Sequence, residues 1–350
     1  MTINLGLPHI PEANVLPVAD GIEFQSHGHF FTTTLDDSEI SSLASTLRTP
    51  LSVILQVTRR CNFDCSFCSE TEQLKDPTLK QLECIKNNLS GVPRVFISGG
   101  EPLIRRDIVE ITEMYEDFVV AIPTNATRGV HLATKLAGKA AFINVGLEGP
   151  RNATNRVRGD YDAIMRGIFA FKEAGLDISL SSVVLRSLVP DLPYLLQIAD
   201  VVEAGKVKLI HPIRKGNGAS LPDAEFLSLR ESGDMFMHLQ GVSERLGLTP
   251  TLRMTTWTPE TEGYSILIYP NGTTWAWPVY GGRANMAEQG GTDDKTLYIG
   301  NVLEEPITTI WERYPFKINH LRKYLGRSIF VSYNGDREVV DARRKQSSKK

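Results

Sequence analysis

The sequence predicts an α/β fold: a partial (β/α)6 TIM-like barrel with an N-terminal extension and a small α+β region at the C-terminus. Short apolar, β-branched segments alternate with amphipathic segments between residues 51 and 215. The apolar segments are nearly continuous, as strands of a parallel sheet covered by helices are. Right-handed crossovers curl such a sheet into a full or partial barrel, whose chemistry lies at the carboxyl ends of the strands.

Six strands are expected in the barrel, each a short apolar run. They are Leu51–Val57, Arg94–Ile97, Phe118–Ile122, Ala141–Leu147, Asp177–Val184 and Val207–Ile210. The intervening helices are expected at Leu79–Leu89, Pro102–Tyr115, His131–Ala137, Asp160–Gly175 and Leu192–Ala204. Asp76 followed by Pro77 is typical of the start of the first helix. Asp160 is the expected N-cap of the fourth, and Gly175 its end.

The chain is expected to divide into four parts. Residues 1–50 are an N-terminal extension, 51–215 the barrel, 216–330 the C-terminal region and 331–350 a flexible basic tail. In the C-terminal region, Asn271-Gly272 predicts a hairpin between Ser265–Tyr269 and Thr273–Trp277. A helix is expected from Pro306 to Leu325, kinked or split at Pro315.

The composition is ordinary for a soluble globular protein and does not favour a polyanionic partner. Hydrophobic residues make up 41% of the 350 residues, charged residues 23%, and the formal net charge is −3. This charge gives no attraction to nucleic acid or to an anionic membrane. The N-terminus has no signal-peptide pattern, and no apolar run approaches the roughly 20 residues that cross a bilayer. A cytoplasmic location is therefore expected.

Three of the four cysteines, Cys61, Cys65 and Cys68, fall within eight positions directly after the first strand. Three neighbouring thiolates can hold a [4Fe–4S] cluster and leave its fourth iron open to another ligand. The alternative is a structural zinc site, which needs a fourth ligand such as Cys84. Cys84 lies within a predicted helix, where a lone cysteine is a small core residue or an accessible hydrogen-atom donor.

The spacing Cys-x-x-x-Cys-x-x-Cys after the first strand resembles the signature of the radical S-adenosylmethionine (SAM) superfamily. This resemblance implies that the open iron binds SAM, and that reductive cleavage gives methionine and a 5′-deoxyadenosyl radical. It also implies one [4Fe–4S] cluster and a flavodoxin- or ferredoxin-type electron donor. Phe67 stands before the third cysteine, where the family often has an aromatic residue whose backbone lies near the adenine.

Two further strand ends match the family. Gly99, Gly100 and Glu101 end the second strand and resemble the Gly-Gly-Glu-Pro motif that contacts the methionyl amino group. Asn125 ends the third strand within a Thr-Asn pair, where family members often continue with glycine. Ala126 stands in place of that glycine, so a different local backbone is possible here. A polar turn without a ligand is the alternative.

Glu148 and Ser181 are weaker candidates for cofactor binding. Glu148 ends the fourth strand, where related members carry aspartate, and its carboxylate can bind a ribose or substrate hydroxyl. The alternative is an ion pair with Arg156 or Arg158. Ser181 lies on the fifth strand, where the family uses a small polar residue near the cofactor; an ordinary strand serine is the alternative.

The region after residue 265 resembles the SPASM extension, which normally binds auxiliary clusters, yet no cysteine follows Cys84. Without an auxiliary acceptor for a second electron, a redox-neutral reaction is favoured. We therefore expect a lyase or isomerase acting on a small polar metabolite such as a sugar or nucleoside, by decarboxylation, dehydration or epimerisation, as in antibiotic biosynthesis. The alternatives are a ribosomal-peptide-modifying radical enzyme and a non-catalytic zinc or interaction module. Trp257, Trp275, Trp277 and Tyr280 are expected to wall the substrate pocket or to serve packing.

Overall fold

The computed structural model describes three N-terminal strands, residues 41, 44 and 45, and then 47–257, 261–279 and 297–325. Tyr280 and the expected basic tail lie outside the described residues. The N-terminal strands β1 (Asn14–Val18), β2 (Gly21–Ser26) and β3 (His29–Thr33) form a separate antiparallel sheet. Helix α10 (Lys317–Leu325) contacts β1 and β2, so the two ends of the described chain lie together.

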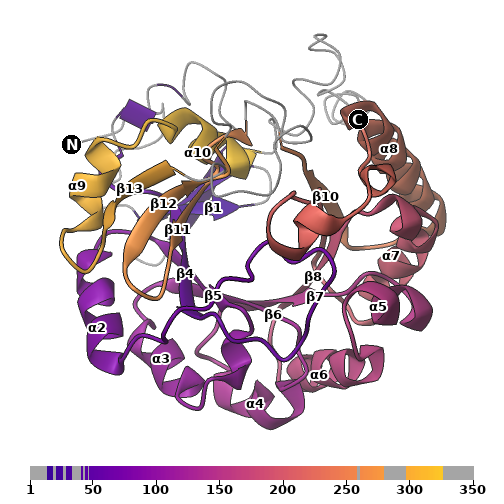
Figure 1. Cartoon of the computed structure of the whole chain (residues 1–350), viewed down its shortest axis with the longest axis horizontal. Coiled ribbons are helices and arrows are strands. Elements are labelled where there is room, and N and C mark those ends of the chain that lie inside the picture. The colour runs from indigo at the N-terminus through magenta and orange to yellow at the C-terminus, as the bar shows by residue number, and fades with distance from the viewer. Residues whose placement is uncertain are drawn as a thin grey trace.

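A ten-stranded sheet forms the body of the molecule, in the order β10-β9-β8-β7-β6-β5-β4-β11-β12-β13. Its strands are β4 (Ser52–Thr58), β5 (Arg94–Gly99), β6 (Val119–Thr124), β7 (Phe142–Gly146), β8 (Ile178–Val183), β9 (Lys206–Ile210), β10 (Thr251–Thr255), β11 (Ser265–Ile268), β12 (Thr273–Trp277) and β13 (Leu297–Asn301). Pairing is parallel from β10 through to β11, and antiparallel from β11 to β13. The sheet curls around a central lumen with helices outside it (Figure 1), which confirms the α/β partial-barrel prediction.

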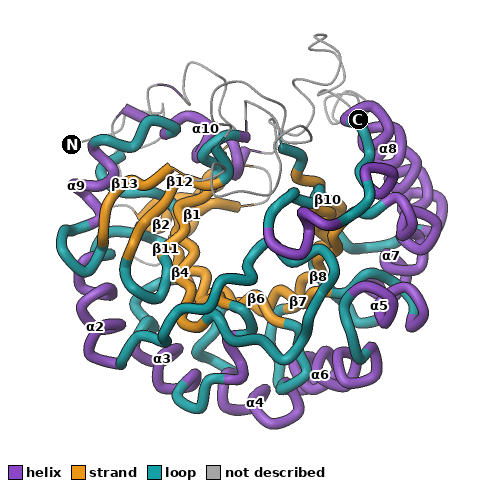
Figure 2. The backbone as a smooth tube through the Cα atoms, viewed as in Figure 1, coloured by secondary structure: helices purple, strands orange, loops and turns teal. Residues whose placement is uncertain are grey.

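The helices of the outer layer follow the strands in alternation. They are α2 (Leu79–Asn88), α3 (Ile108–Met114), α4 (Gly129–Leu136), α5 (Arg151–Val157), α6 (Tyr161–Glu173), α7 (Leu192–Val201), α8 (Leu229–Leu246), α9 (Ile307–Glu312) and α10, with a 3-10 turn at Pro102–Ile104. Alternate strand residues such as Val53, Leu55 and Val57 are fully buried against this layer. Their neighbours Ile54 and Gln56 therefore face the lumen. The tube in Figure 2 shows how the loops gather over the opening of the barrel.

Several helix boundaries differ from the sequence prediction. Thr78, not Asp76, caps α2: its hydroxyl accepts a hydrogen bond from the backbone N–H of Gln81 at 3.2 Å. The Asp76 carboxylate instead accepts from Thr58 Oγ1, which holds the chain leaving β4. The expected helix at Pro102–Tyr115 is divided into the 3-10 turn and α3.

Other helix ends agree with their sequence signals. Asp160 caps α6 by accepting from the backbone N–H of Ala163 at 3.0 Å. Gly175 follows α6 with a φ of 75°, in the left-handed region. The helix expected from Pro306 to Leu325 is split into α9 and α10, as Pro315 predicted.

The sheet continues beyond residue 215, and its strand β10 was not predicted from the sequence. Helix α8 leads into β10, which pairs in parallel with β9, so that a further strand–helix unit extends the barrel. On the other side, β11 pairs in parallel with β4 through Leu267 and Ile54. The predicted hairpin of β11 and β12 is therefore part of the same sheet as the barrel. None of the described helices is long and apolar enough to span a bilayer.

Candidate active site

A cavity of about 350 Å³ lies at the carboxyl ends of strands β4 to β8. The loop that follows β4 crosses this end of the barrel and carries the three clustered cysteines (Figure 1). The cavity is bordered by most of the residues that the sequence singled out: Cys61, Cys65, Cys68, Phe67, Gly99, Gly100, Glu101, Asn125 and Ser181. Glu148 and Cys84 are not among its lining residues. Parallel strand ends thus bring together side chains from distant parts of the chain.

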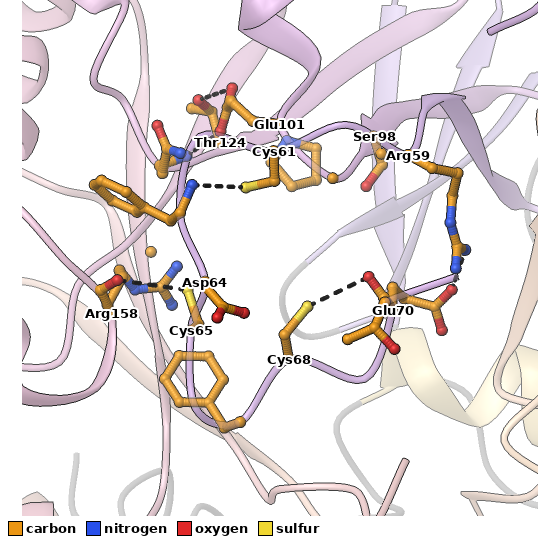
Figure 3. A pocket seen from close by; sticks show the side chains of 18 of the residues that line it. Arg59, Cys61, Asp64, Cys65, Cys68, Glu70, Ser98, Glu101, Thr124 and Arg158 are labelled. Carbon is orange, nitrogen blue, oxygen red and sulfur yellow. Dashed lines mark hydrogen bonds and ion pairs between the residues drawn. The ribbon is translucent and has the colours of Figure 1, made fainter. Parts of the chain in front are cut away.

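The side chains of Cys61, Cys65 and Cys68 border one open space in Figure 3. All three are free thiols. The loop that carries them is held from both sides: Ser66 donates its backbone N–H to Val157 O at 3.0 Å, and Asn217 Nδ2 donates to Cys65 O at 3.0 Å. The position of the thiols is therefore fixed by α5 and by the chain after β9.

The electrostatics of these thiols fit ligands of a cationic metal centre. Burial raises the pKa of Cys65 to about 12 and also raises that of Cys68. A metal ligand must be a thiolate, so these groups need a bound cation to ionise near neutral pH. No three His, Cys, Asp or Glu side chains in the described ranges converge closely enough to hold a single ion. Thiols set apart around one cavity fit a polynuclear iron–sulfur cluster, in which each thiolate binds a different iron.

Gly99, the last residue of β5, and Gly100 after it allow this strand end to pack against the base of the cysteine loop. A Cβ atom on Gly99 would lie 2.3 Å from Thr58 O, and one on Gly100 would lie 2.4 Å from Arg60 O. Gly100 donates its N–H to Thr58 O at 2.9 Å. No larger residue fits either position, so the glycines bring Glu101 and the cysteine loop to the same wall of the cavity.

Glu101 organises that wall. Its side chain is nearly fully buried and accepts hydrogen bonds from Leu103 N at 2.9 Å, Thr124 Oγ1 at 2.6 Å and Asn125 N at 2.6 Å. Burial raises the pKa of Glu101, although these donors oppose the shift. Three donors hold the carboxylate in one orientation at the cavity, where it can accept from the ammonium group of a bound ligand.

Asn125 ties the end of β6 to the cysteine loop, because its Nδ2 donates to Asn62 Oδ1 at 2.8 Å. The next residue, Ala126, has a φ of 62°. This is the left-handed conformation that glycine adopts easily and alanine adopts at a cost. The replacement of the family's glycine therefore leaves the backbone in a glycine-like conformation. Gly167 of α6 packs on this turn, since a Cβ on it would lie 1.9 Å from Ala126 O.

Glu148 pairs with Arg158, one of the two alternatives that the sequence left open, and does not reach the cavity. Its carboxylate is fully buried and accepts from Arg158 Nε at 2.6 Å and Nη2 at 2.7 Å. Arg158 itself lines the cavity, with its guanidinium carbon 5.1 Å from the centre of the Phe67 ring. The charged group presented by this strand end is thus an arginine. The Arg-x-Arg-Gly sequence after Glu148 was the available signal.

A second charged network beside Cys68 was not predicted. Glu70 forms ion pairs with Arg59 and with Lys215, whose Nζ lies 2.9 Å from Glu70 Oε1. Lys215 also donates to the hydroxyl of Tyr269 at 3.2 Å, and the Arg59 guanidinium lies over the Tyr269 ring at 5.0 Å. Tyr269 directly follows β11, so this network joins the C-terminal region to the cysteine loop. The network contains two cations and one carboxylate, so its own formal charge is positive.

Cys84 lies apart from the other cysteines. It belongs to α2, which covers the outer face of the sheet, and its thiol lies 3.9 Å from Leu303 O. Since it does not line the cavity, the geometry supports neither a hydrogen-donor role nor a fourth metal ligand. The tryptophans also lie outside the cavity lining: the rings of Trp257 and Trp277 pack edge to face with centroids 5.0 Å apart.

Comparison with known proteins agrees with this geometry. Residues 55–191 match the model of the "Radical SAM superfamily". These residues form a radical SAM domain. A radical SAM domain uses a [4Fe–4S] cluster and SAM, so the two cofactors expected from the sequence are confirmed at the level of the family.

Relatives of the radical SAM domain differ in what they act on. An Fe-coproporphyrin III synthase of Methanosarcina barkeri is 27% identical over 193 residues, covering 51% of this chain and 48% of the relative. A PqqA peptide cyclase of Bradyrhizobium diazoefficiens is 28% identical over 202 residues, covering 52% and 53%. The chain thus matches about half the length of these two relatives.

The fold is shared with a solved protein that was crystallised with SAM. The crystal structure of Streptococcus suis SuiB bound to S-adenosylmethionine has a TM-score of 0.65, with 15% identity, over 88% of this chain and 89% of that one. The likeness therefore extends beyond the radical SAM domain into the C-terminal part of the chain.

Proposed function

We propose that this chain holds one [4Fe–4S] cluster through Cys61, Cys65 and Cys68 and acts on a small polar metabolite of the sugar or nucleoside type. When bound, the cluster and SAM supply a 5′-deoxyadenosyl radical that takes a hydrogen atom from the substrate. The observation that carries the proposal is one cavity bordered by three free thiols, the fixed Glu101 carboxylate and the Arg158 guanidinium. A volume of about 350 Å³ is in the range of small-ligand sites.

The other residues that line the cavity orient SAM and the substrate. Glu101 accepts from the amino group of SAM, while Gly99 and Gly100 place it there. Phe67, Asn125 and Ser181 offer an aromatic face, an amide and a hydroxyl to the nucleoside part. Glu148 acts indirectly, since it holds Arg158 over Phe67. Orientation of this kind sets which hydrogen atom of the substrate lies within reach.

The reaction we propose is redox-neutral: decarboxylation, dehydration or epimerisation in a specialised pathway such as antibiotic assembly. No cysteine follows Cys84 in the sequence, so the SPASM-like region 216–330 has no thiolate for an auxiliary cluster. Without that acceptor, the electron stays with the substrate or returns to the first cluster. A flavodoxin- or ferredoxin-type protein is the proposed electron donor.

A second candidate is modification of a ribosomal peptide. It is favoured by the relatives, because PqqA peptide cyclase is named for a peptide and SuiB has been crystallised with its precursor peptide SuiA. A peptide substrate would need an open path into the lumen. A metabolite and a precursor peptide are therefore tested side by side as substrates.

Anaerobic reconstitution with iron and sulfide, followed by reduction and SAM, tests the proposal. We expect about four irons and four sulfides per chain and formation of 5′-deoxyadenosine. Replacing Cys61, Cys65 or Cys68 with alanine should abolish both. Cys84→Ala is the matched control, because it removes a thiol that lies outside the cavity.

Two results would contradict the assignment. One is iron uptake and SAM cleavage that survive in Cys65→Ala. The other is a protein that binds one zinc ion per chain and no sulfide, which would instead favour the interaction-module alternative.

A further inference from the structure

The strands of the barrel sheet carry a one-sided charge. The ten strands contain Arg94, Lys206, Lys208 and Arg253 as basic residues, and neither aspartate nor glutamate occurs in any of them. The whole chain, by contrast, has a formal net charge of −3. The strands of this sheet therefore carry basic side chains and no carboxylate side chain.

The lysines of β9 point into the lumen. Val207 and Leu209 are fully buried in the core between the sheet and the helices. Because side chains alternate along a strand, Lys206 and Lys208 face the opposite side, which is the inside of the barrel. On β10 the same alternation applies: Leu252 and Met254 belong to that core, so Arg253 between them faces the lumen.

The register of the sheet places these cations beside the cofactor cavity. Lys208 lies opposite Ser181 on one side and opposite Arg253 on the other. Ser181 lies opposite Gly146, and both of these residues line the cavity. Neighbouring strands are about 4.8 Å apart, so Lys208 is the next residue in the row after the cavity wall, and Arg253 the one after that.

Lys208 carries a charge that the described protein does not balance. Among the residues the structure describes, none forms a hydrogen bond or ion pair with its ammonium group. Burial, with Lys206 nearby, lowers the pKa of Lys208 to about 8. A cation held inside a protein without a partner is costly, and an anionic ligand removes that cost.

We propose that the β9–β10 wall binds an oxyanion of the substrate, a carboxylate or a phosphate, through Lys208 with Arg253 beside it. This inference rests on the proposed function in one respect: it takes the bound anion to be the substrate of the same cavity. It narrows the substrate class from polar to anionic, for example a sugar acid or a nucleotide. Lys208 supplies the point charge that binds the oxyanion, and Arg253 adds positive charge beside it.

Binding of simple anions to the full-length protein tests this site. Malonate and inorganic phosphate stand for the two oxyanions, and glycerol is the uncharged control. Tryptophan fluorescence is the readout, since Trp257 donates to His211 O just after β9. We expect saturable binding of at least one anion and none of glycerol. Because Lys208→Met loses a charged hydrogen bond, its anion affinity should fall at least about tenfold. Lys208→Arg keeps the charge and should retain binding.

Lys172→Met is the matched control, because Lys172 lies on the outer surface in an ion pair with Glu203. It should bind the anions like the wild type. The site is overturned if neither anion saturates, or if Lys208→Met binds as tightly as the wild type while its unfolding midpoint is no lower than that of the wild type. Iron content and SAM cleavage are measured in the same samples. If the wild type takes up no iron and forms no 5′-deoxyadenosine, the proposed function is refuted. If the wild type does both and only anion binding fails, the anion site alone is refuted.

Discussion

The Arg158 guanidinium donates two hydrogen bonds to the buried Glu148 carboxylate, from Nε at 2.6 Å and from Nη2 at 2.7 Å. The pair bridges the end of β7 and the end of α5. A Cβ atom on Gly146 would lie 2.5 Å from the guanidinium carbon, so the glycine leaves space for it. The arginine is therefore locked between the strand ends, with its remaining face toward Phe67 and the cavity.

Breaking this pair should destabilise the fold. Glu148→Gln keeps the shape of the side chain but leaves the Arg158 charge buried without its counter-ion, which typically costs about 3–5 kcal/mol. Urea unfolding measures the change. Arg151→Met, which removes an exposed pair with Asp162, is the control and should leave the midpoint nearly unchanged. Equal shifts of the midpoint in the two variants would show that the buried pair contributes no more to stability than the exposed pair.

The Glu70 network predicts a compensating double substitution. Burial acts to lower the pKa of Lys215, but Glu70 outweighs it and holds that pKa above its usual value. Glu70→Gln leaves Lys215 and Arg59 facing each other, so we expect a loss of about 3 kcal/mol in unfolding free energy. Adding Lys215→Met should restore part of it. A double substitution that is simply additive in urea unfolding argues against coupling between Glu70 and Lys215.

Lys208 should make stability depend on pH. Its folded pKa of about 8 lies below the ordinary value of 10.5, so the unfolded chain binds more protons between these two pH values. The destabilisation is full below about pH 8 and disappears as the pH rises toward 10.5. Relative to Lys208→Met, the wild type should therefore gain stability across this window. Urea midpoints of both proteins at several pH values measure the difference, which a flat curve would contradict.

Two helical glycines should respond in opposite ways to alanine. In α6, a Cβ on Gly167 would lie 1.9 Å from Ala126 O, so Gly167→Ala must push the helix from β6 and cost at least about 1–3 kcal/mol. In α8, a Cβ on Gly241 meets nothing within 4 Å. Gly241→Ala should stabilise by about 0.5–1 kcal/mol through helix propensity. Thermal unfolding compares them, and shifts of the same sign would be inconsistent with this packing.

The sequence was sufficient for the barrel strands and for the residues at their carboxyl ends. Apolar runs marked the strands, and parallel strand ends meet at one edge, so Cys61, Glu101 and Asn125 were expected together. All three residues border the same cavity. The helix cap at Thr78 was missed because Asp76 and Thr78 are both capping residue types, and only their partners distinguish them.

Features that depend on which strands or side chains pair with one another were harder to predict. β10 was missed because Thr251–Thr255 alternates polar and apolar residues around Arg253 and lacks a continuous apolar run. The charge of the lumen was missed for a related reason, since Lys208 was assigned only to an apolar strand. Its significance depends on lying opposite Ser181, which requires the register of the sheet. The pairing of Glu148 with Arg158 and not Arg156 depended on how the end of α5 lies, since Arg156 donates to Ser187 O instead.

β4 precedes the cysteine loop, and its neighbour β11 comes from much later in the chain. During synthesis on the ribosome, one edge of β4 therefore stays unpaired until β11 has been made. Arg59, which pairs with Glu70, likewise lacks its contact with the Tyr269 ring until then. The loop gains its final surroundings only after most of the polypeptide has been made. This topology favours insertion of iron and sulfide into the finished chain, after translation is complete.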